Sequence, residues 1–238
     1  MTTPAFMSDS LRGVVFDAYG TLFDVYSIAS RADQLFPGMG GSISTLWRDK
    51  QIEYSRLVSL SDPSPSGSRY YQSFWDLTRL ALEYTLKRLS LPSGSGQVAE
   101  LMRGYATLDA FPECSEVLRS LKAAGLSTAI LSNGSPEMLK AATESAGLAS
   151  LVGHLISVEE IRHFKTSPLS YALAPGKLEL PKESLLFVSS NGWDIVGASW
   201  FGFRTCWINR QALPTETISA PPDYVCSDLR GVLEALPA

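Results

Sequence analysis

Short apolar segments that alternate with helix-like patterns constrain the fold of this chain more than any other feature. Five segments have the composition of buried strands, and a sixth follows near the C-terminus: residues 13–17, 127–133, 155–158, 185–190, 203–208 and 223–227. Helical periodicity lies between them, over residues 114–124, 137–146 and 193–201. Strands that alternate with helices predict an α/β fold, in which helices cover both faces of a Rossmann-like parallel sheet.

The part of the chain between the first two strands breaks this alternation, because it has no segment with the composition of a strand. Two stretches there, 44–60 and 70–89, carry helical periodicity, and a loop rich in serine and proline joins them over residues 61–68. An insert after the first strand lies over the edge of the sheet where open α/β folds bind ligands. The sequence therefore predicts two parts: a helical cap over residues 26–110 and an α/β core over residues 1–25 and 111–238.

Bulk properties exclude several classes of protein. The net charge is −4 and no run of basic residues is present, which argues against a nucleic-acid partner. No window approaches the roughly 18 apolar residues of a membrane span, and the N-terminal MTTPAFMSDS does not resemble a signal peptide. The two histidines, His154 and His163, do not suggest a Ser-His-Asp hydrolase. The three cysteines, Cys114, Cys206 and Cys226, form no CxxC pair, so we expect free thiols in a cytoplasmic protein.

Polar side chains follow four of the predicted strands. In chain order they are Asp17, Ser132 with Asn133, Lys165, and the segment from Ser189 to Asp194. A single serine or asparagine after a strand is usually a turn residue or a helix cap. However, the carboxyl ends of parallel strands meet at one edge of the sheet, so these side chains converge there. The repeated pattern, in the order Asp, Ser, Lys, Asp, predicts a catalytic site.

This order of residues resembles the haloacid dehalogenase superfamily, which has a nucleophilic aspartate, a Ser/Thr, a lysine, a terminal acidic motif and an early helical cap. Within it, five strings are similar to the L-2-haloacid dehalogenases: FDAYGTLFDV, LWRDKQIEYS, AILSNGSPEML, LLFVSSNGWD and FGFRTCWINR. The resemblance runs from about residue 11 to the C-terminus. It implies the haloacid dehalogenase fold, hydrolysis of a small 2-haloacid without a cofactor, and a homodimer.

Two positions favour the dehalogenases over the phosphatases of the same superfamily. Such phosphatases carry a second aspartate two residues after the nucleophile, and they bind Mg²⁺ with carboxylates of the first and last motifs. Tyr19 and Ser190 occupy those places here. Mg²⁺ favours oxygen ligands that usually include carboxylates, so no metal site is expected, and a halide leaves without a proton. Two alternatives stay open: an Mg²⁺-dependent phosphatase or phosphonatase, and a non-catalytic binding module that retains the fold.

The resemblance also implies the catalytic roles. Asp17 attacks the halogen-bearing carbon, and Lys165 keeps that carboxylate ionised and oriented. Arg48 reaches down from the cap to stabilise the departing halide. The remaining catalytic residues position the water, the ester or the nucleophile: Asn191, Asp194, Ser189, which holds Lys165 or the ester oxygen, and Thr21.

Substrate binding is expected to involve residues of both parts of the chain. The Ser132 hydroxyl and the backbone N–H groups of Ala18, Tyr19 and Asn133 are the expected donors to the substrate carboxylate. The Asn133 side chain also faces the halide. The residues expected to shape the pocket are Arg48, Phe74, Tyr171 and Trp193, with an ordinary core position as the alternative for Phe74.

Overall fold

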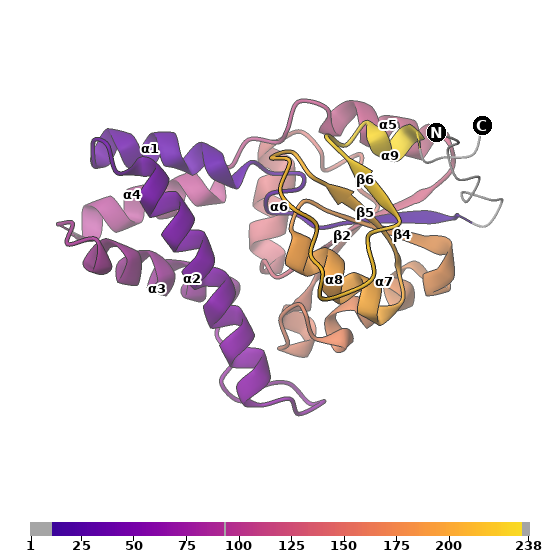
Figure 1. Ribbon diagram of the computed structural model, residues 1–238, viewed down its shortest axis with the longest axis horizontal. Coiled ribbons are helices and arrows are strands. Elements are labelled where there is room, and N and C mark those ends of the chain that lie inside the picture. Colours follow the sequence, from indigo (N-terminus) through magenta and orange to yellow (C-terminus); the bar gives the residue numbers. More distant parts are fainter. Residues whose placement is uncertain (1–10, 93, 235–238) are drawn as a thin grey trace.

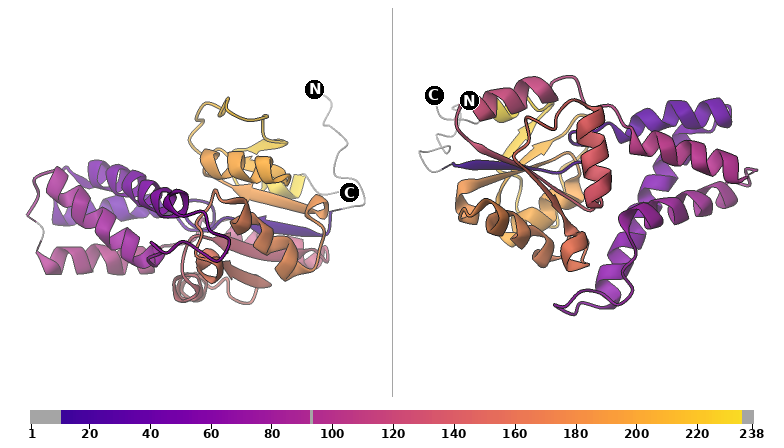
Figure 2. Two further views of the ribbon diagram at one scale, coloured as in Figure 1. Left: turned by 90° about the horizontal axis from the view of Figure 1, so that it is seen from below. Right: turned by 180° about the vertical axis from the view of Figure 1, so that it is seen from behind.

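The computed structural model describes residues 11–92 and 94–234, so the expectation about the N-terminal ten residues lies outside the described residues. Two parts lie side by side: a group of four helices and a larger part built on a sheet (Figure 1). Figure 2 shows the four helices gathered at one end of the molecule in two further views. Among the described residues, no helix combines the length and the apolar character needed to cross a membrane.

The sheet has six parallel strands in the order β3-β2-β1-β4-β5-β6. Their bounds are β1 Gly13–Phe16, β2 Ser127–Ser132, β3 His154–Ser157, β4 Leu185–Ser189, β5 Arg204–Ile208 and β6 Tyr224–Cys226. Each lies in one of the six predicted segments or begins one residue before it, and the predicted α/β class is confirmed. The central strand β1 is buried along its whole length, since Val15 pairs with Ala129 on one side and Phe187 on the other.

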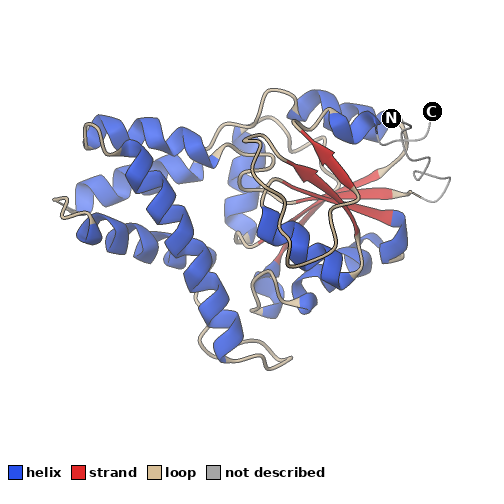
Figure 3. Cartoon of the chain, in the orientation of Figure 1, coloured by secondary structure: helices blue, strands red, loops and turns tan. Residues whose placement is uncertain are grey.

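Helices cover both faces of this sheet (Figures 1 and 3). Helices α7 and α8 pack on one face, and α5 and α9 lie on the other. The bounds of the core helices are α5 Cys114–Ala123, α6 Pro136–Ser145, α7 Pro168–Leu178, α8 Gly192–Phe201 and α9 Gly231–Glu234. Short 3₁₀ turns complete the chain at η1 Val25–Ser27, η2 Val158–Ile161 and η3 Lys182–Ser184. The core helices expected from periodicity therefore appear as α5, α6 and α8.

The four remaining helices form the cap between β1 and β2. Their bounds are α1 Ile28–Leu35, α2 Gly40–Ser61, α3 Phe74–Arg88 and α4 Ser95–Ala106. The long helix α2 packs on both α1 and α3 and extends past them toward the core (Figure 1). The predicted helix over 70–89 is wrong at its start, because the Ser73 hydroxyl accepts the backbone N–H of Asp76 and caps a helix that begins at Phe74.

The strand order places a crevice at the carboxyl end of β1. From β1 the chain adds β2 and β3 on one side, then returns to add β4, β5 and β6 on the other. Ligands bind at such a reversal in open α/β sheets. Asp17 follows the last residue of β1 and therefore lies in this crevice.

Candidate active site

Asp17 is the centre of a buried cluster of charged side chains. Lys165, in the loop after η2, donates from Nζ to Asp17 Oδ1 over 3.0 Å. The same ammonium group donates to Asp194 Oδ2 over 2.8 Å, and Asp194 lies in the first turn of α8. The exposed fractions of these residues are 5% for Asp17, 1% for Lys165 and 0% for Asp194. Three segments far apart in sequence thus bring two carboxylates onto one cation.

The other carboxylate oxygens also have donors. Asp17 Oδ2 accepts from the Thr21 hydroxyl over 3.1 Å and from Asn191 Nδ2 over 2.8 Å. Asp194 Oδ1 accepts from the hydroxyl of Tyr171 over 2.7 Å. Hydrogen bonds to ionised groups are stronger than those between neutral groups, so they fix the orientation of both carboxylates.

Two buried carboxylates share one ammonium group, and the pKa values of Lys165 and Asp194 are shifted in this environment. Burial alone lowers the pKa of Lys165, but Asp17 and Asp194 outweigh it, and the pKa is raised. Burial raises the pKa of Asp194 to about 6; Asp17 adds to this shift and Lys165 opposes it. Asp194 is therefore a group that can take up a proton near neutral pH.

Arg48 reaches this cluster from the cap. Its Nη2 donates to the backbone oxygen of Tyr19 over 3.2 Å and to Asn191 Oδ1 over 3.4 Å. Its Nη1 donates to Gln51 Oε1 over 2.7 Å, one turn along α2. Because Asn191 also donates to Asp17, a single amide lies between the guanidinium of the cap and the carboxylate of the core.

Aromatic rings line the same region. The Tyr19 ring lies 6.1 Å from the ring of Phe74 and 5.4 Å from that of Tyr105, between ring centroids. Phe74 also lies 6.0 Å from Phe164 and is buried. Ala18 is fully buried beside Tyr19. Phe74 is therefore a buried core residue that neighbours Tyr19, and its role as a wall of the halide pocket stays a prediction.

The serine and asparagine residues of the site bind backbone groups. Asn133 Oδ1 accepts the backbone N–H of Lys165 over 2.9 Å, which fixes the segment that carries the lysine. The Ser132 hydroxyl accepts the N–H of Gly134 over 3.1 Å. The Ser189 hydroxyl accepts the N–H of Asn191 over 3.1 Å; among the described residues its recorded partner is this group rather than Lys165.

Trp193 and Tyr171 differ in their distance from solvent. Tyr171 is fully buried, and its ring lies 5.6 Å from that of Phe187 between centroids. Trp193 is partly exposed at the start of α8, where the guanidinium of Arg56 lies 5.2 Å from its ring centroid. Tyr171 thus donates to Asp194 from the buried side of the site. Trp193 lies at the solvent-exposed rim of the site.

The structure adds two cap residues that the sequence reasoning missed. Gln51 is buried and donates from Nε2 to the hydroxyls of Thr78 and Tyr105, over 2.6 and 3.1 Å. Its spacing of three residues from Arg48 on a predicted helix is a signal for this contact. Tyr105 gave no such signal, because it lies on α4, 54 residues from Gln51.

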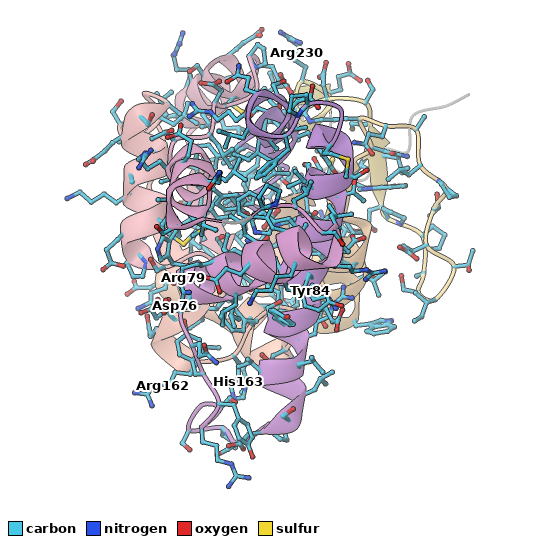
Figure 4. All side chains as sticks on the ribbon, turned by 90° about the vertical axis from the view of Figure 1, so that its left-hand side faces the viewer. Asp76, Arg79, Tyr84, Arg162, His163 and Arg230 are labelled. Atoms are coloured by element: carbon cyan, nitrogen blue, oxygen red, sulfur yellow. The ribbon has the colours of Figure 1, made fainter. Side chains whose placement is uncertain are left out.

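A contact between cap and core directly precedes Lys165. The His163 ring donates from Nε2 to the backbone oxygen of Ser64 over 2.6 Å, and the N–H of Phe164 donates to the Ser59 hydroxyl over 2.7 Å. Figure 4 shows His163 beside the far end of α2. The segment that carries Lys165 is therefore fastened to the cap.

Negative charge at the site is balanced by the side chains themselves. Among residues 11–92 and 94–234, no three or more His, Cys, Asp or Glu side chains are grouped so that they could hold a metal ion. The cation between Asp17 and Asp194 is the ammonium of Lys165. The donor set thus lacks the extra carboxylates that a Mg²⁺ site usually has.

A hollow of about 270 Å³ adjoins the site on the outer side of Asn191. Gly20, Ser190 and Arg210 are among the residues that line it. Asn191 is also a lining residue, and its amide donates to Asp17.

Comparisons with known proteins agree with this geometry. The family model described as haloacid dehalogenase-like hydrolase matches residues 11–202. An (S)-2-haloacid dehalogenase of Pseudomonas sp. (strain YL) is 43% identical over 226 residues, which cover 95% of this chain and 94% of the relative. The chain belongs to the 2-haloacid dehalogenase family. The family resemblance read from the sequence is thereby confirmed.

Solved structures of 2-haloacid dehalogenases match the whole fold. The crystal structure of one L-2-haloacid dehalogenase has 52% identity and a TM-score of 0.93, covering 96% of this chain and 100% of its own. The L-2-haloacid dehalogenase of Xanthobacter autotrophicus with chloropropionic acid covalently bound has 37% identity and a TM-score of 0.84. That match covers 94% of this chain and 97% of the other. The core and the cap of this dehalogenase chain thus have counterparts in both structures.

Proposed function

We propose that this protein is an (S)-2-haloacid dehalogenase, which hydrolyses short-chain L-2-haloalkanoates to 2-hydroxy acids and halide without a metal ion. The observation that carries this proposal is the buried Asp17 carboxylate, held by Lys165, Thr21 and Asn191 at the switch point of the sheet. Tyr19 stands two residues later, where a phosphatase needs an acid. Such a site supplies a nucleophile but no acid two residues after it.

In the first step, an oxygen of Asp17 attacks C2 of the substrate from the side opposite the halogen. A carbon–oxygen bond forms while the carbon–halogen bond breaks, and the halide keeps the bonding electron pair. The configuration at C2 inverts. Arg48 of the cap donates to Asn191, which binds Asp17 in turn. Its guanidinium stabilises the charge that develops on the halide.

In the second step, water attacks the carboxyl carbon of Asp17 in the ester. Asp194 accepts the proton of this water, and its burial, which raises the pKa of this carboxyl, favours the protonated form. Asn191, which donates to Asp17 Oδ2, orients the ester. The bond between the Asp17 carboxyl carbon and the substrate oxygen then breaks, and the proton held by Asp194 passes to the departing oxygen. The 2-hydroxy acid leaves with its C2–O bond intact, and Asp17 retains an oxygen atom from water and loses its proton to solvent.

The substrate carboxylate is held by backbone donors. The N–H groups of Ala18, Tyr19 and Asn133 all follow strand ends, and none of them donates to an oxygen of the described residues. Buried N–H groups without a partner are costly, so an anion that accepts from them is stabilised. The Ser132 hydroxyl lies next to Asn133 and completes this set of donors.

The metal-dependent phosphatase is the rival function, and one assay separates the two. Chloride release is measured from the separated enantiomers of 2-chloropropionate, with and without EDTA. We expect release from the L enantiomer, with D-lactate as the product, at a rate that EDTA does not change. Turnover of phosphoesters that EDTA abolishes, with no chloride release, would contradict the proposal.

The limits of the two parts, the assembly and the location are further proposals. We propose a core of residues 1–25 and 111–238 and a cap of residues 26–110; the bridge between Phe23 and Ala110, where the chain leaves and re-enters the core, supports these limits. We also propose a cytoplasmic homodimer. Exposed apolar side chains on α2 support an interface there, and sedimentation velocity tests it.

A further inference from the structure

Arg56 is a partly exposed residue of α2 that the proposed mechanism does not use. It lies eight residues after Arg48, about 12 Å farther along the helix axis. Its guanidinium stacks over the ring of Trp193, 5.2 Å from the centroid. Trp193 lies between Asn191 and Asp194 in the sequence, and both of these contact the site. Arg56 thus brings a second positive charge of the cap to the rim of the site.

Arg56 has no anionic partner among the described residues, whereas two other arginines of the cap do. Arg79 forms an ion pair with Glu83 over 2.7 Å, and Arg103 pairs with Glu100. Within the part of the chain that the structure describes, no carboxylate lies within ion-pair distance of Arg56, and its guanidinium makes no hydrogen bond. Stacking on an indole fixes a guanidinium but leaves its N–H groups free to bind a carboxylate.

The charged side chains of the site balance one another before the substrate binds, so the charge of the substrate has no counterpart among them. Two carboxylates, Asp17 and Asp194, face two cations, Lys165 and Arg48, so an incoming 2-haloacid adds a negative charge that none of them balances. Burial raises the pKa of Tyr171, whereas the charge of Arg56 acts to lower it. Since the Tyr171 hydroxyl binds Asp194, the field of Arg56 extends into the site.

We propose that Arg56 is a specificity-determining residue, which attracts small monocarboxylate anions to the rim beside Trp193 and balances their charge in the bound complex. This inference rests on the proposed function, because it concerns the substrate of that same site. A merely structural role is the rival: Arg56 would then only hold the cap against the core through Trp193. Charge separates the two roles, because lysine at position 56 retains it and methionine does not.

Binding of propionate to the full chain tests the proposal without turnover, since propionate has no halogen to lose. Titration calorimetry gives Kd for the wild type, Arg56→Met and Arg56→Lys, and propionamide serves as the neutral ligand of the same shape. We expect Arg56→Met to weaken propionate binding about five-fold, which is about 1 kcal/mol. Arg56→Lys restores the affinity to within about two-fold. Propionamide binds all three proteins alike.

A control variant, Arg103→Met, removes the same charge from a distant cap helix, where it is paired with Glu100, and leaves Kd unchanged. KM for L-2-chloropropionate rises with the Kd of Arg56→Met by the same factor. Equal propionate affinities of Arg56→Met and wild type, a loss shared by Arg56→Lys or by propionamide, or no binding to wild type would each overturn the inference. Failure of the wild type to release chloride refutes the proposed function instead.

Discussion

Replacement of Lys165 by methionine tests the charge balance at the site. Its ammonium lies 3.0 Å from Asp17 Oδ1 and 2.8 Å from Asp194 Oδ2, and the exposed side-chain fractions are 0%, 7% and 0% in that order. Methionine has a similar volume and fills the space beside the Phe187 ring. The variant thus places two carboxylates together in a buried site without a cation.

The expected cost depends on pH in a calculable way. Breaking a buried ion pair by removing one partner costs about 3–5 kcal/mol. Protonation of one carboxyl sets an upper limit, because the folded state then holds a proton that the unfolded state binds with a pKa of about 3.9. That limit is about 5.6 kcal/mol at pH 8 and about 1.5 kcal/mol at pH 5. The folded pKa is raised, so stability falls as the pH rises.

Urea denaturation at pH 5, 6.5 and 8 measures this dependence. We expect Lys165→Met to lose about 3–5 kcal/mol at pH 8 and no more than about 1.5 kcal/mol at pH 5. The double variant Lys165→Met/Asp194→Asn recovers most of the stability but no activity. Lys177→Met is the control, since Lys177 pairs with Glu160 at the surface. Its loss lowers the unfolding free energy by less than about 1 kcal/mol. A loss that is equal at pH 5 and pH 8 would refute the reasoning.

Three further predictions concern single groups of the site. The steady-state rate of turnover falls by about tenfold per pH unit once the pH is low enough to protonate Asp194, because protonated Asp194 cannot accept the water proton of the second step; burial raises the pKa of this carboxyl, so the acid limb lies above the range of an ordinary aspartate. Asp194→Asn lacks this acid limb, and a limb that persists in the variant contradicts the assignment. Tyr171→Phe removes the donor to Asp194 Oδ1 and lowers the unfolding free energy by about 1–3 kcal/mol in urea. Arg48→Ala lowers kcat about 10²–10³-fold, and Gln51→Met lowers it less. Both losses of kcat are larger for chloro than for iodo substrates. Equal losses for the two halogens would contradict the assignment of Arg48 to the leaving halide.

The strands of the core could be predicted from the sequence because they are buried on both faces. The run Gly13–Phe16 is apolar and β-branched, and a charged residue marks its end. The cap was less accessible to prediction. Helix α4 begins with Ser95 and Gly96, which are poor helix formers, so the start of this helix has the composition of a loop. Helix α1 has only eight residues, and packing against α2 rather than intrinsic propensity stabilises it.

The members of the site could be predicted because polar residues at parallel strand ends converge. Asp17, Lys165 and Asp194 satisfy this rule, and the structure brings them within hydrogen-bond distance. Contacts of the cap side chains could not be predicted in the same way. Arg56 over Trp193 depends on how α2 lies against α8, and no periodicity in the sequence specifies the arrangement of two such parts.

Covalent attack by Asp17 is the central claim, and oxygen labelling tests it most directly. The enzyme turns over L-2-chloropropionate many times in H₂¹⁸O, and mass spectrometry then locates the label in its peptides. The account predicts ¹⁸O in the peptide that contains Asp17, and unlabelled lactate after a single turnover. Lactate labelled in that first turnover, with an unlabelled Asp17 peptide, would contradict it.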